Sequence, residues 1–373
     1  MTANAQEKTT GRVVSIDALR GFDMFWIIGG GTFFMNLFTW LDTPFFRGLA
    51  GQFAHTPWNG FTFEDFIFPL FLFIVGLSIP FSLTKRLARG DDRRDLYLHI
   101  LKRFLILFAL GLIYNGLFNF DLPHQRLMGV LQRISLCYLF ASLIVMNFSP
   151  KGQAVWTVLL LLFYWAAMTL IPVPGYGAGV LTPEGNLTTF IDEYILPGKL
   201  SNYGLGHRGD ANGVLSTIPA ISSALLGVLC GHWIRSDFSH SVKIRRLLLA
   251  GAGCIVSSLL WDLVFPINKP LWTSSYVLFA GGLSMILFTF FYWVIDVRGY
   301  RKWAFPFVIV GLNSITIYVI GGLFDFGVIA AIFIHGFVNS MGAFKPAFQA
   351  LCAVSVKWLF LYFLWRQKIF LKV

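Results

Sequence analysis

The chain contains a succession of apolar segments, most of them long enough to cross a lipid bilayer, and this pattern restricts the fold more than any other feature. A helix that spans the bilayer core takes about 20 predominantly apolar residues. We count ten candidate segments, near residues 19–38, 63–83, 104–117, 130–148, 154–171, 215–234, 247–265, 275–295, 304–323 and 351–365. Because lipid offers the backbone no hydrogen-bond partners, we predict an all-α polytopic integral membrane protein with about ten transmembrane helices.

Composition supports this prediction. Of the 373 residues, 56% are hydrophobic and 13% are charged, and a soluble domain of this length cannot bury so much apolar side chain. The net charge of +11 comes from Lys and Arg in short loops between the apolar segments, rather than from one soluble basic face. We therefore expect the lipid bilayer, and not a nucleic acid, as a partner.

The basic residues also predict the topology. They concentrate in residues 85–103, 235–246 and 296–302, which follow the second, sixth and eighth apolar segments. The positive-inside rule assigns these loops, and with them both termini, to the cytoplasm. Residues 1–12 would form a cytoplasmic tail and residues 13–373 the membrane domain, with a long outer loop near 173–212.

The weaker segment 324–344 complicates the count of spans. Asp325, His335 and Asn339 interrupt it, so we interpret it as a re-entrant or short outer segment. Eleven spans, with the C-terminus outside, are the alternative.

Two further patterns argue against common cofactor sites. The four cysteines lie inside apolar segments without paired spacing, which predicts free thiols and no zinc site. The glycine-rich stretch "IIGGGTF" at 27–33 has neither a P-loop lysine nor a preceding strand, so it predicts helix packing or a kink rather than nucleotide binding. We expect no metal and no redox cofactor.

The stretch "HTPWNGFTFED" places ionisable groups at the outer end of the second apolar segment. A histidine with a pKa of about 6.5 can take up and release a proton near neutral pH, which makes His55 a candidate general base. Glu64 and Asp65 can orient its ring or hold a cationic substrate. Loop histidines are more often plain surface residues, and His124 and His207 are rivals on the same face.

Other polar residues lie close to apolar segments. Asp17 and Arg20 are three residues apart near the cytoplasmic end of a helix, a spacing that favours an ion pair, either structural or part of a ligand site. Arg133 lies just inside a helix near the outer face, which implies a buried carboxylate, an anionic ligand or a carbonyl cluster beside it. These residues alone indicate a membrane enzyme or transporter with a polar outer mouth.

A set of motifs gives a more specific indication. In order they read "SIDALRGFDM", "WNGFTFEDFIFPLFLFIVGLSI", "GVLQRISLCY", "GVLSTIPAISSALLGVLCG", "NKPLWTSSYV", "DVRGY" and "GLNSITIYV". From Val14 to the C-terminus, the chain resembles the catalytic membrane domain of heparan-alpha-glucosaminide N-acetyltransferases and their bacterial relatives. The resemblance implies acetyl transfer from cytoplasmic acetyl-CoA to a terminal glucosamine across the membrane. It also implies a homodimer and, since the luminal domain of lysosomal members is missing, a multi-pass protein of a bacterial inner membrane.

The resemblance also implies roles for individual residues. The family's active-site histidine lies just before the "WNG" motif, and the corresponding residue here is His55. It acts either as a general base in direct transfer or as a nucleophile that carries the acetyl group. We expect Arg20, with Asp17, near the CoA phosphates. The expected substrate-binding or supporting residues, which include candidate oxyanion donors, are Trp58, Asn59, Asp65, Arg133 and Asn313.

Two departures from the family bear on this function, the first on how His55 is oriented or on the reaction itself, and the second on the acceptor. Lysosomal members have an asparagine just before the triple glycine, where this chain has Ile27 and Ile28. Relatives often have Pro-Glu-Gly ahead of the sixth segment, where this chain reads Ala211, Asn212 and Gly213. An amino-sugar transporter is the alternative function, because a ten-helix bundle with a polar outer mouth permits both.

Overall fold

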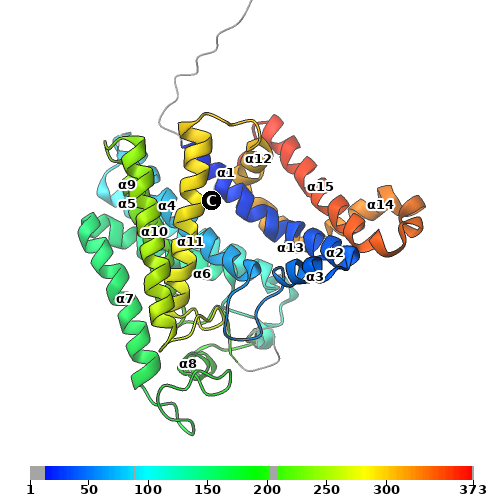
Figure 1. Cartoon of the computed structure of the whole chain (residues 1–373). Helices are drawn as coiled ribbons and strands as arrows, with labels where there is room; N and C mark the ends of the chain where they lie inside the picture. Colours follow the sequence, from blue (N-terminus) through cyan, green and yellow to red (C-terminus); the bar gives the residue numbers. More distant parts are fainter. Residues whose placement is uncertain (1–12, 88, 202–208, 372–373) are drawn as a thin grey trace, which may run out of the picture.

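The computed structural model describes residues 13–87, 89–201 and 209–371, and the regular elements within these residues are helices (Figure 1). The all-α prediction is therefore confirmed. The elements are α1 Val14–Phe25, η1 Trp26–Gly30, α2 Gly31–Leu41, α3 Pro44–Gly51, α4 Phe63–Leu87, α5 Arg93–Tyr114, α6 Val130–Asn147, α7 Pro150–Leu170, α8 Leu187–Ile195, α9 Thr217–Arg235, α10 His240–Asp262, α11 Ser274–Phe291, η5 Tyr292–Val297, α12 Phe305–Leu312, α13 Ser314–Leu323, α14 Phe326–Val338, η6 Asn339–Phe344 and α15 Lys345–Arg366, with short 3₁₀ turns at Leu117–Asn119 and Leu122–His124.

The number of membrane spans agrees with the prediction of about ten. Among the described residues, nine helical stretches are long and apolar enough to cross a bilayer. A tenth is formed if α12 and α13, which meet at a bend of 71°, count as one broken span.

The segment 324–344 forms α14, a helix of 13 residues, followed by the 3₁₀ turn η6. Alone, α14 is shorter than the roughly 20 residues that a span requires. It packs mainly against α15, and Figure 1 shows it projecting from one side of the bundle. Our interpretation of this segment as re-entrant or outer stays a prediction.

The centre of the bundle is the pair α4 and α9, the two most buried spans. They approach closely because glycines face each other's backbone. A Cβ on Gly76 would lie 1.8 Å from the carbonyl oxygen of Ala224, and a Cβ on Gly227 would lie 1.9 Å from that of Phe73. Small residues that let helix backbones touch are a typical device of membrane interfaces.

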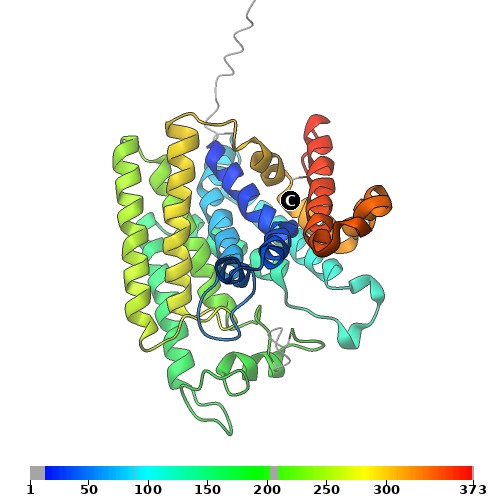
Figure 2. The same cartoon turned by 45° about the vertical axis from the view of Figure 1, so that its right-hand side comes forward.

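The glycine-rich stretch after α1 forms a kink, as predicted. Gly29 has φ +130°, a conformation that disfavours side chains, and the turns around it are those of a π-helix. The break lets α2 leave the direction of α1, and α3 follows after a short turn. The connection from α3 to α4, residues 52–62, then lies in the half of the molecule opposite to the start of α1 (Figure 2).

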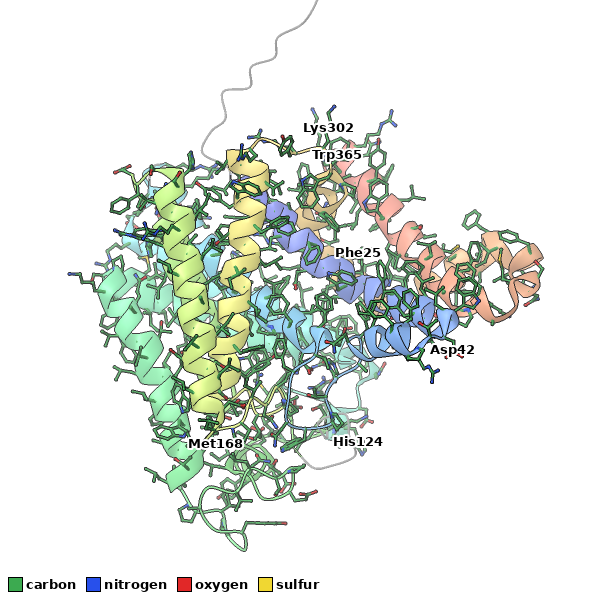
Figure 3. All side chains as sticks on the ribbon, in the orientation of Figure 1. Phe25, Asp42, His124, Met168, Lys302 and Trp365 are labelled. Carbon is green, nitrogen blue, oxygen red and sulfur yellow. The ribbon has the colours of Figure 1, made fainter. Side chains whose placement is uncertain are left out.

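The two ends of the bundle carry different connections. Lys302 and Trp365 lie at one end, while His124 and Met168 lie at the other (Figure 3). We call the end with Lys302 and the start of α1 the basic end, and the opposite one the loop end. The loop end carries residues 52–62, the α10–α11 connection and the segment containing α8. The four cysteines have free thiols, as predicted.

Candidate active site

Asp65 organises the loop that precedes α4. It lies in the first turn of the helix and is fully buried. Its Oδ2 accepts hydrogen bonds from the backbone N–H and hydroxyl of Thr56, at 3.2 and 3.1 Å, and from the same two groups of Thr62, at 3.2 and 3.0 Å. These contacts, of which the Thr62 hydroxyl is shared with the Ala54 carbonyl at 2.8 Å, stabilise the ionised carboxylate and fold residues 56–62 around it.

His55 lies against the other oxygen of Asp65. Its Nδ1 is 2.9 Å from Asp65 Oδ1. An ionised carboxylate only accepts hydrogen bonds, so Nδ1 carries the proton and Nε2 has the free lone pair. The His55 side chain is 58% exposed and that of Asp65 only 1%, so a buried carboxylate orients an imidazole that an external substrate can reach. The structure thus brings His55 and Asp65 together, as the sequence predicted.

Lys269 is a member of this cluster that sequence reasoning did not single out. It lies in the α10–α11 connection, and its Nζ is 3.0 Å from His55 Nδ1, 3.4 Å from His55 Nε2 and 3.4 Å from Asp65 Oδ1. Burial lowers the pKa of Lys269, while the Asp65 and Glu64 carboxylates oppose that shift. The sequence signal was the "NKPLW" stretch, but only the fold places it beside His55.

Asn268 holds the Lys269 segment against the His55 loop. Its Nδ2 donates to the Trp58 carbonyl at 3.1 Å and to Asn59 Oδ1 at 3.0 Å, and its Oδ1 accepts from the Leu271 N–H at 2.7 Å. The Gly60 N–H donates to the Ile267 carbonyl at 2.8 Å. These hydrogen bonds therefore fix the loop that carries His55 and the segment that carries Lys269 relative to each other.

Trp58 and Asn59 serve these loop contacts. Trp58 Nε1 donates to the Leu181 carbonyl at 2.9 Å, which attaches the long connection between α7 and α9 to the site. Asn59 Oδ1 is occupied by Asn268. The structure thus brings both residues next to His55, but the indole N–H expected to be an oxyanion donor is already bonded.

Arg133 is completely buried and reaches the cluster through aromatic rings. Its guanidinium lies 4.8 Å from the Trp272 ring centroid, Trp272 packs on Tyr276, and the Tyr276 hydroxyl donates to the Asp65 carbonyl at 2.6 Å. Arg133 Nη2 donates to the Gly213 carbonyl and the Ser216 hydroxyl. The sequence predicted a buried carboxylate, an anionic ligand or a carbonyl cluster beside Arg133, and the structure shows the backbone carbonyl of Gly213 there. Among the described residues, its Nε and Nη1 have no hydrogen-bond partner.

Gly213, which matches the glycine of the relatives' Pro-Glu-Gly and follows the departing residue Asn212, is in contact with a carboxylate from α8. Asp192 Oδ1 accepts from the Val214 N–H at 2.8 Å, and a Cβ on Gly213 would lie 1.7 Å from Asp192 Oδ2. Burial raises the pKa of Asp192 to about 7. A second carboxylate, Asp210, forms a bidentate salt bridge with Arg126, with contacts of 3.0 and 2.7 Å. Carboxylates are therefore present around this position without the glutamate of relatives.

Asn313 does not join the His55 cluster. Its side chain donates to the Ile369 carbonyl at 3.1 Å and accepts from the Leu371 N–H at 3.0 Å. Asn313 lies at the break between α12 and α13, and it fixes the C-terminal segment there. The expectation that it donates to an oxyanion near His55 is corrected accordingly.

The other sequence candidates lie apart from the cluster. Arg20 pairs with Asp17 at 3.1 Å, as predicted, and also donates to the Ser78 hydroxyl at 2.8 Å. His124 is 76% exposed and pairs with Asp121. His207 lies outside the described residues.

The isoleucines that replace the family's asparagine form part of the kink. The Ile28 carbonyl accepts a hydrogen bond from Lys357 Nζ at 2.7 Å, so a side chain of α15 stabilises the broken helix.

A second residue missed from the sequence is Asp23 in α1. Its side chain is fully buried, and neither oxygen has a hydrogen-bond partner among the described residues. A carboxyl group in this setting is costly when ionised.

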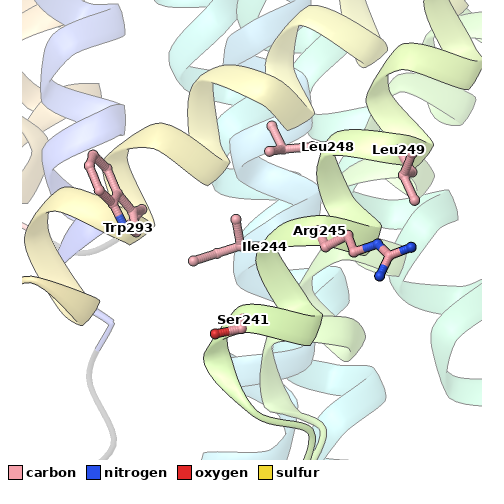
Figure 4. Close-up of a pocket in the computed structure, with 6 residues that line it drawn as sticks. All are labelled: Ser241, Ile244, Arg245, Leu248, Leu249 and Trp293. Carbon is pink, nitrogen blue, oxygen red and sulfur yellow. The ribbon is translucent and has the colours of Figure 1, made fainter.

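An open groove of about 490 Å³ lies elsewhere. Ser241, Ile244, Arg245, Leu248 and Leu249 of α10 line it with Trp293 (Figure 4). The five α10 residues lie in the first half of that helix, whereas Lys269 follows the C-terminal end of α10. With a rise of about 1.5 Å per residue, the ends of this helix are roughly 30 Å apart, so the groove is separate from the His55 cluster.

The fold and the cluster define a multi-pass helical membrane protein with a carboxylate, a histidine and a lysine assembled at one end of its bundle. In the described residues no group of three His, Cys, Asp or Glu side chains is arranged to hold a metal ion.

Comparison with known proteins identifies the family. A family model described as "Heparan-alpha-glucosaminide N-acetyltransferase, catalytic" matches residues 12–251, so the chain belongs to this family. It is 30% identical to heparan-alpha-glucosaminide N-acetyltransferase of Mus musculus over 327 residues, which cover 73% of this chain and 49% of that protein. It is 27% identical to the Homo sapiens protein of the same name over 425 residues, which cover 97% of this chain and 60% of that protein. The chain thus spans between about half and three fifths of these relatives.

Proposed function

We propose that this protein is a membrane N-acetyltransferase that transfers acetyl from acetyl-CoA to the amine of a terminal amino sugar of the glucosamine type. The observation that carries the proposal is the buried Asp65 holding His55 with Nε2 free and accessible, in a chain of this family. Asp–His pairs of this kind activate a nucleophile or remove its proton.

His55 has two possible tasks in such a reaction. In direct transfer, Nε2 accepts the proton of the amine as the amine nitrogen attacks the thioester carbon, and the C–S bond breaks when the intermediate collapses. In the covalent route, Nε2 itself attacks and carries the acetyl group to the amine. In both routes a positive charge develops on the imidazole, and Asp65 at 2.9 Å stabilises it.

We place the donor at the basic end and the acceptor at the loop end. Arg20 and the loop residues Lys85, Arg86, Lys102 and Arg103 would offer cations to the CoA phosphates, and the positive-inside rule puts this end in the cytoplasm. The amino sugar would then reach His55 from the outside. This arrangement fits a multi-pass protein of a bacterial inner membrane, with both termini cytoplasmic, and by family resemblance a homodimer.

The test is acetyl transfer from labelled acetyl-CoA to glucosamine by the detergent-purified protein. We expect His55→Ala to lower kcat by about 10²-fold or more, the usual contribution of a general base. His124→Ala is the matched control, because that histidine also pairs with an aspartate but lies outside the cluster. A folded parent protein that transfers acetyl to no amino sugar, or a fully active His55→Ala variant, would contradict the proposal.

An amino-sugar transporter is the second candidate, and the bent pair α12–α13 favours it. Discontinuous helices are typical of the substrate sites of transporters, and this pair bends by 71°. Uptake of labelled glucosamine into proteoliposomes without CoA would support transport. Uptake no faster than in protein-free vesicles, together with acetylation in detergent, would reject the transporter and support the enzyme.

A further inference from the structure

The position of Lys269 relative to the His55 ring is unusual for a salt-bridge partner. Its Nζ is 3.0 Å from Nδ1 and 3.4 Å from Nε2. Because Cε1 lies between these two atoms, an atom in the ring plane would overlap Cε1 before it came so close to both. The ammonium therefore lies over the face of the imidazole, and it leaves the in-plane lone pair of Nε2 open to a substrate.

The hydrogen-bonding capacity of Lys269 is only partly used in this position. Nδ1 donates its proton to Asp65 and cannot also accept one from Lys269. Asp65 Oδ1 lies 3.4 Å from Nζ and accepts from one of its N–H groups at most. An ammonium has three donors. N–H groups are thus left for an acceptor that arrives beside Nε2.

The surroundings hold Lys269 in place beside His55 and Asp65. Burial lowers its pKa, but the Asp65 carboxylate favours the protonated form. Its side chain is 16% exposed, and the neighbouring Asn268 bonds to the Trp58 carbonyl and to Asn59. A preorganised donor of this kind stabilises developing charge more effectively than water does.

We propose that Lys269 is a catalytic residue that donates a hydrogen bond to the oxyanion formed on the acetyl carbonyl beside His55 Nε2. The proposal rests on the acyltransferase function above. When the nucleophilic nitrogen bonds to the carbonyl carbon, the C=O π electrons move to oxygen, and the ammonium binds that oxygen without giving up its proton. When the C=O bond re-forms, the C–S bond breaks and CoA leaves as the thiolate.

Other candidate donors to the oxyanion near the cluster are already bonded or lie out of reach. Trp58 Nε1 is bonded to the Leu181 carbonyl, and Asn313 is bonded to the C-terminal segment. Arg133 is completely buried behind Trp272. Among the residues that the structure describes, Lys269 is the cation that directly contacts the imidazole.

The experiment compares Lys269→Met and Lys269→Arg with the parent in steady-state acetyl transfer from acetyl-CoA to glucosamine. Loss of an oxyanion donor lowers kcat by about 10²- to 10³-fold, so we expect that loss in Lys269→Met, with the KM for acetyl-CoA changed less than about threefold. Lys269→Arg keeps a charged donor and should retain at least about ten times the kcat of the methionine variant. Lys151→Met, at an exposed lysine at the start of α7, is the control and should match the parent.

The outcomes separate this proposal from the proposed function. An inactive parent rejects the acyltransferase itself. An active parent with a Lys269→Met variant of similar kcat, or with a loss confined to KM, overturns the role of Lys269 alone. If Lys269→Met fails to fold, Lys269→Leu, which likewise has no donor, replaces it, and equal kcat values for the Leu and Arg variants overturn the proposal.

Discussion

At the scale of single residues, the site depends on one buried carboxylate that serves two loops. Asp65 folds residues 56–62 with Oδ2 and orients His55 with Oδ1, while Lys269 approaches from the α10–α11 connection. A change at Asp65 should therefore affect the imidazole more directly than a change at any other member of the cluster.

Asp65→Asn should abolish most of the activity while preserving the fold. The amide oxygen would face the donors of Thr56 and Thr62, which turns the NH₂ group toward His55 Nδ1. The imidazole must then accept at Nδ1 and carry its proton on Nε2, the wrong tautomer for a base. We expect kcat to fall by about 10²- to 10⁴-fold.

The check is kcat of Asp65→Asn, His55→Ala and the double variant, with thermal unfolding of each. Residues that act as a unit give non-additive losses, so the double variant should be no slower than His55→Ala. Fully multiplicative losses would speak against a coupled pair.

Asp192 predicts a pH dependence of stability. Its pKa in the folded protein is about 7 because of burial, with Asp210 raising and Arg133 lowering it. In the unfolded chain an aspartate ionises at about 3.9, so the native state binds the proton more tightly. Protonated Asp192 therefore contributes to the free energy of unfolding. This contribution is complete below about pH 3.9 and is lost as the pH rises from there to about 7, a total of up to about 4 kcal/mol.

Thermal unfolding of the parent and Asp192→Asn at pH 5 and pH 8 measures this effect. The asparagine can still accept the Val214 N–H but does not titrate. We expect the Tm difference between pH 5 and pH 8 to be smaller in the variant. The same difference in both proteins would mean that Asp192 ionises as an ordinary surface carboxylate.

At the scale of elements, helix contacts depend on the absence of side chains at a few positions. The α4–α9 pair is central to the bundle, and through α4 it supports the turn that carries Asp65. Gly76 and Gly227 are where the two backbones meet.

Gly227→Ala should destabilise the protein strongly, by several kcal/mol, because its methyl group would overlap the Phe73 carbonyl and force the helices apart. Gly253→Ala in α10 is the matched control, since a Cβ there meets no atom within 4 Å. Alanine suits a helix better than glycine, so this control should be neutral or slightly more stable. Tm values that fall equally in both variants would contradict the packing argument.

At the scale of the whole molecule, the bundle separates a basic end from the loop end that holds His55. The proposed reaction needs these ends on opposite sides of a membrane. Single cysteines introduced into a variant without the four native cysteines report the sidedness directly.

We expect His124→Cys to react with a membrane-impermeant maleimide in intact spheroplasts, and Lys302→Cys to react only after permeabilisation. The two positions lie at opposite ends of the bundle, and the positive-inside rule assigns the Lys302 end to the cytoplasm. The reverse pattern would place both termini outside and would reject the proposed path of the acetyl group.

Sequence reasoning found His55 and Asp65 because they are ten residues apart, on one side of one apolar segment. It also found the kink, since three consecutive glycines have a local effect on a helix. It missed Lys269, which is 214 residues from His55, and it misplaced Asn313, whose partners are at the C-terminus. Such pairings depend on how the helices pack, and one chain's local pattern does not contain that information.

The sequence by itself determined the all-helical class, the approximate number of spans and the distribution of charge between them. These follow from the cost of exposing backbone groups and charges to lipid, which acts on each segment separately. Only the tertiary structure decided that Asp65 is shared by His55 and Lys269 and that Arg133 lies behind Trp272. Each of these contacts joins side chains from different helices or loops, and glycine-mediated approach of α4 and α9 fixes the frame in which they meet.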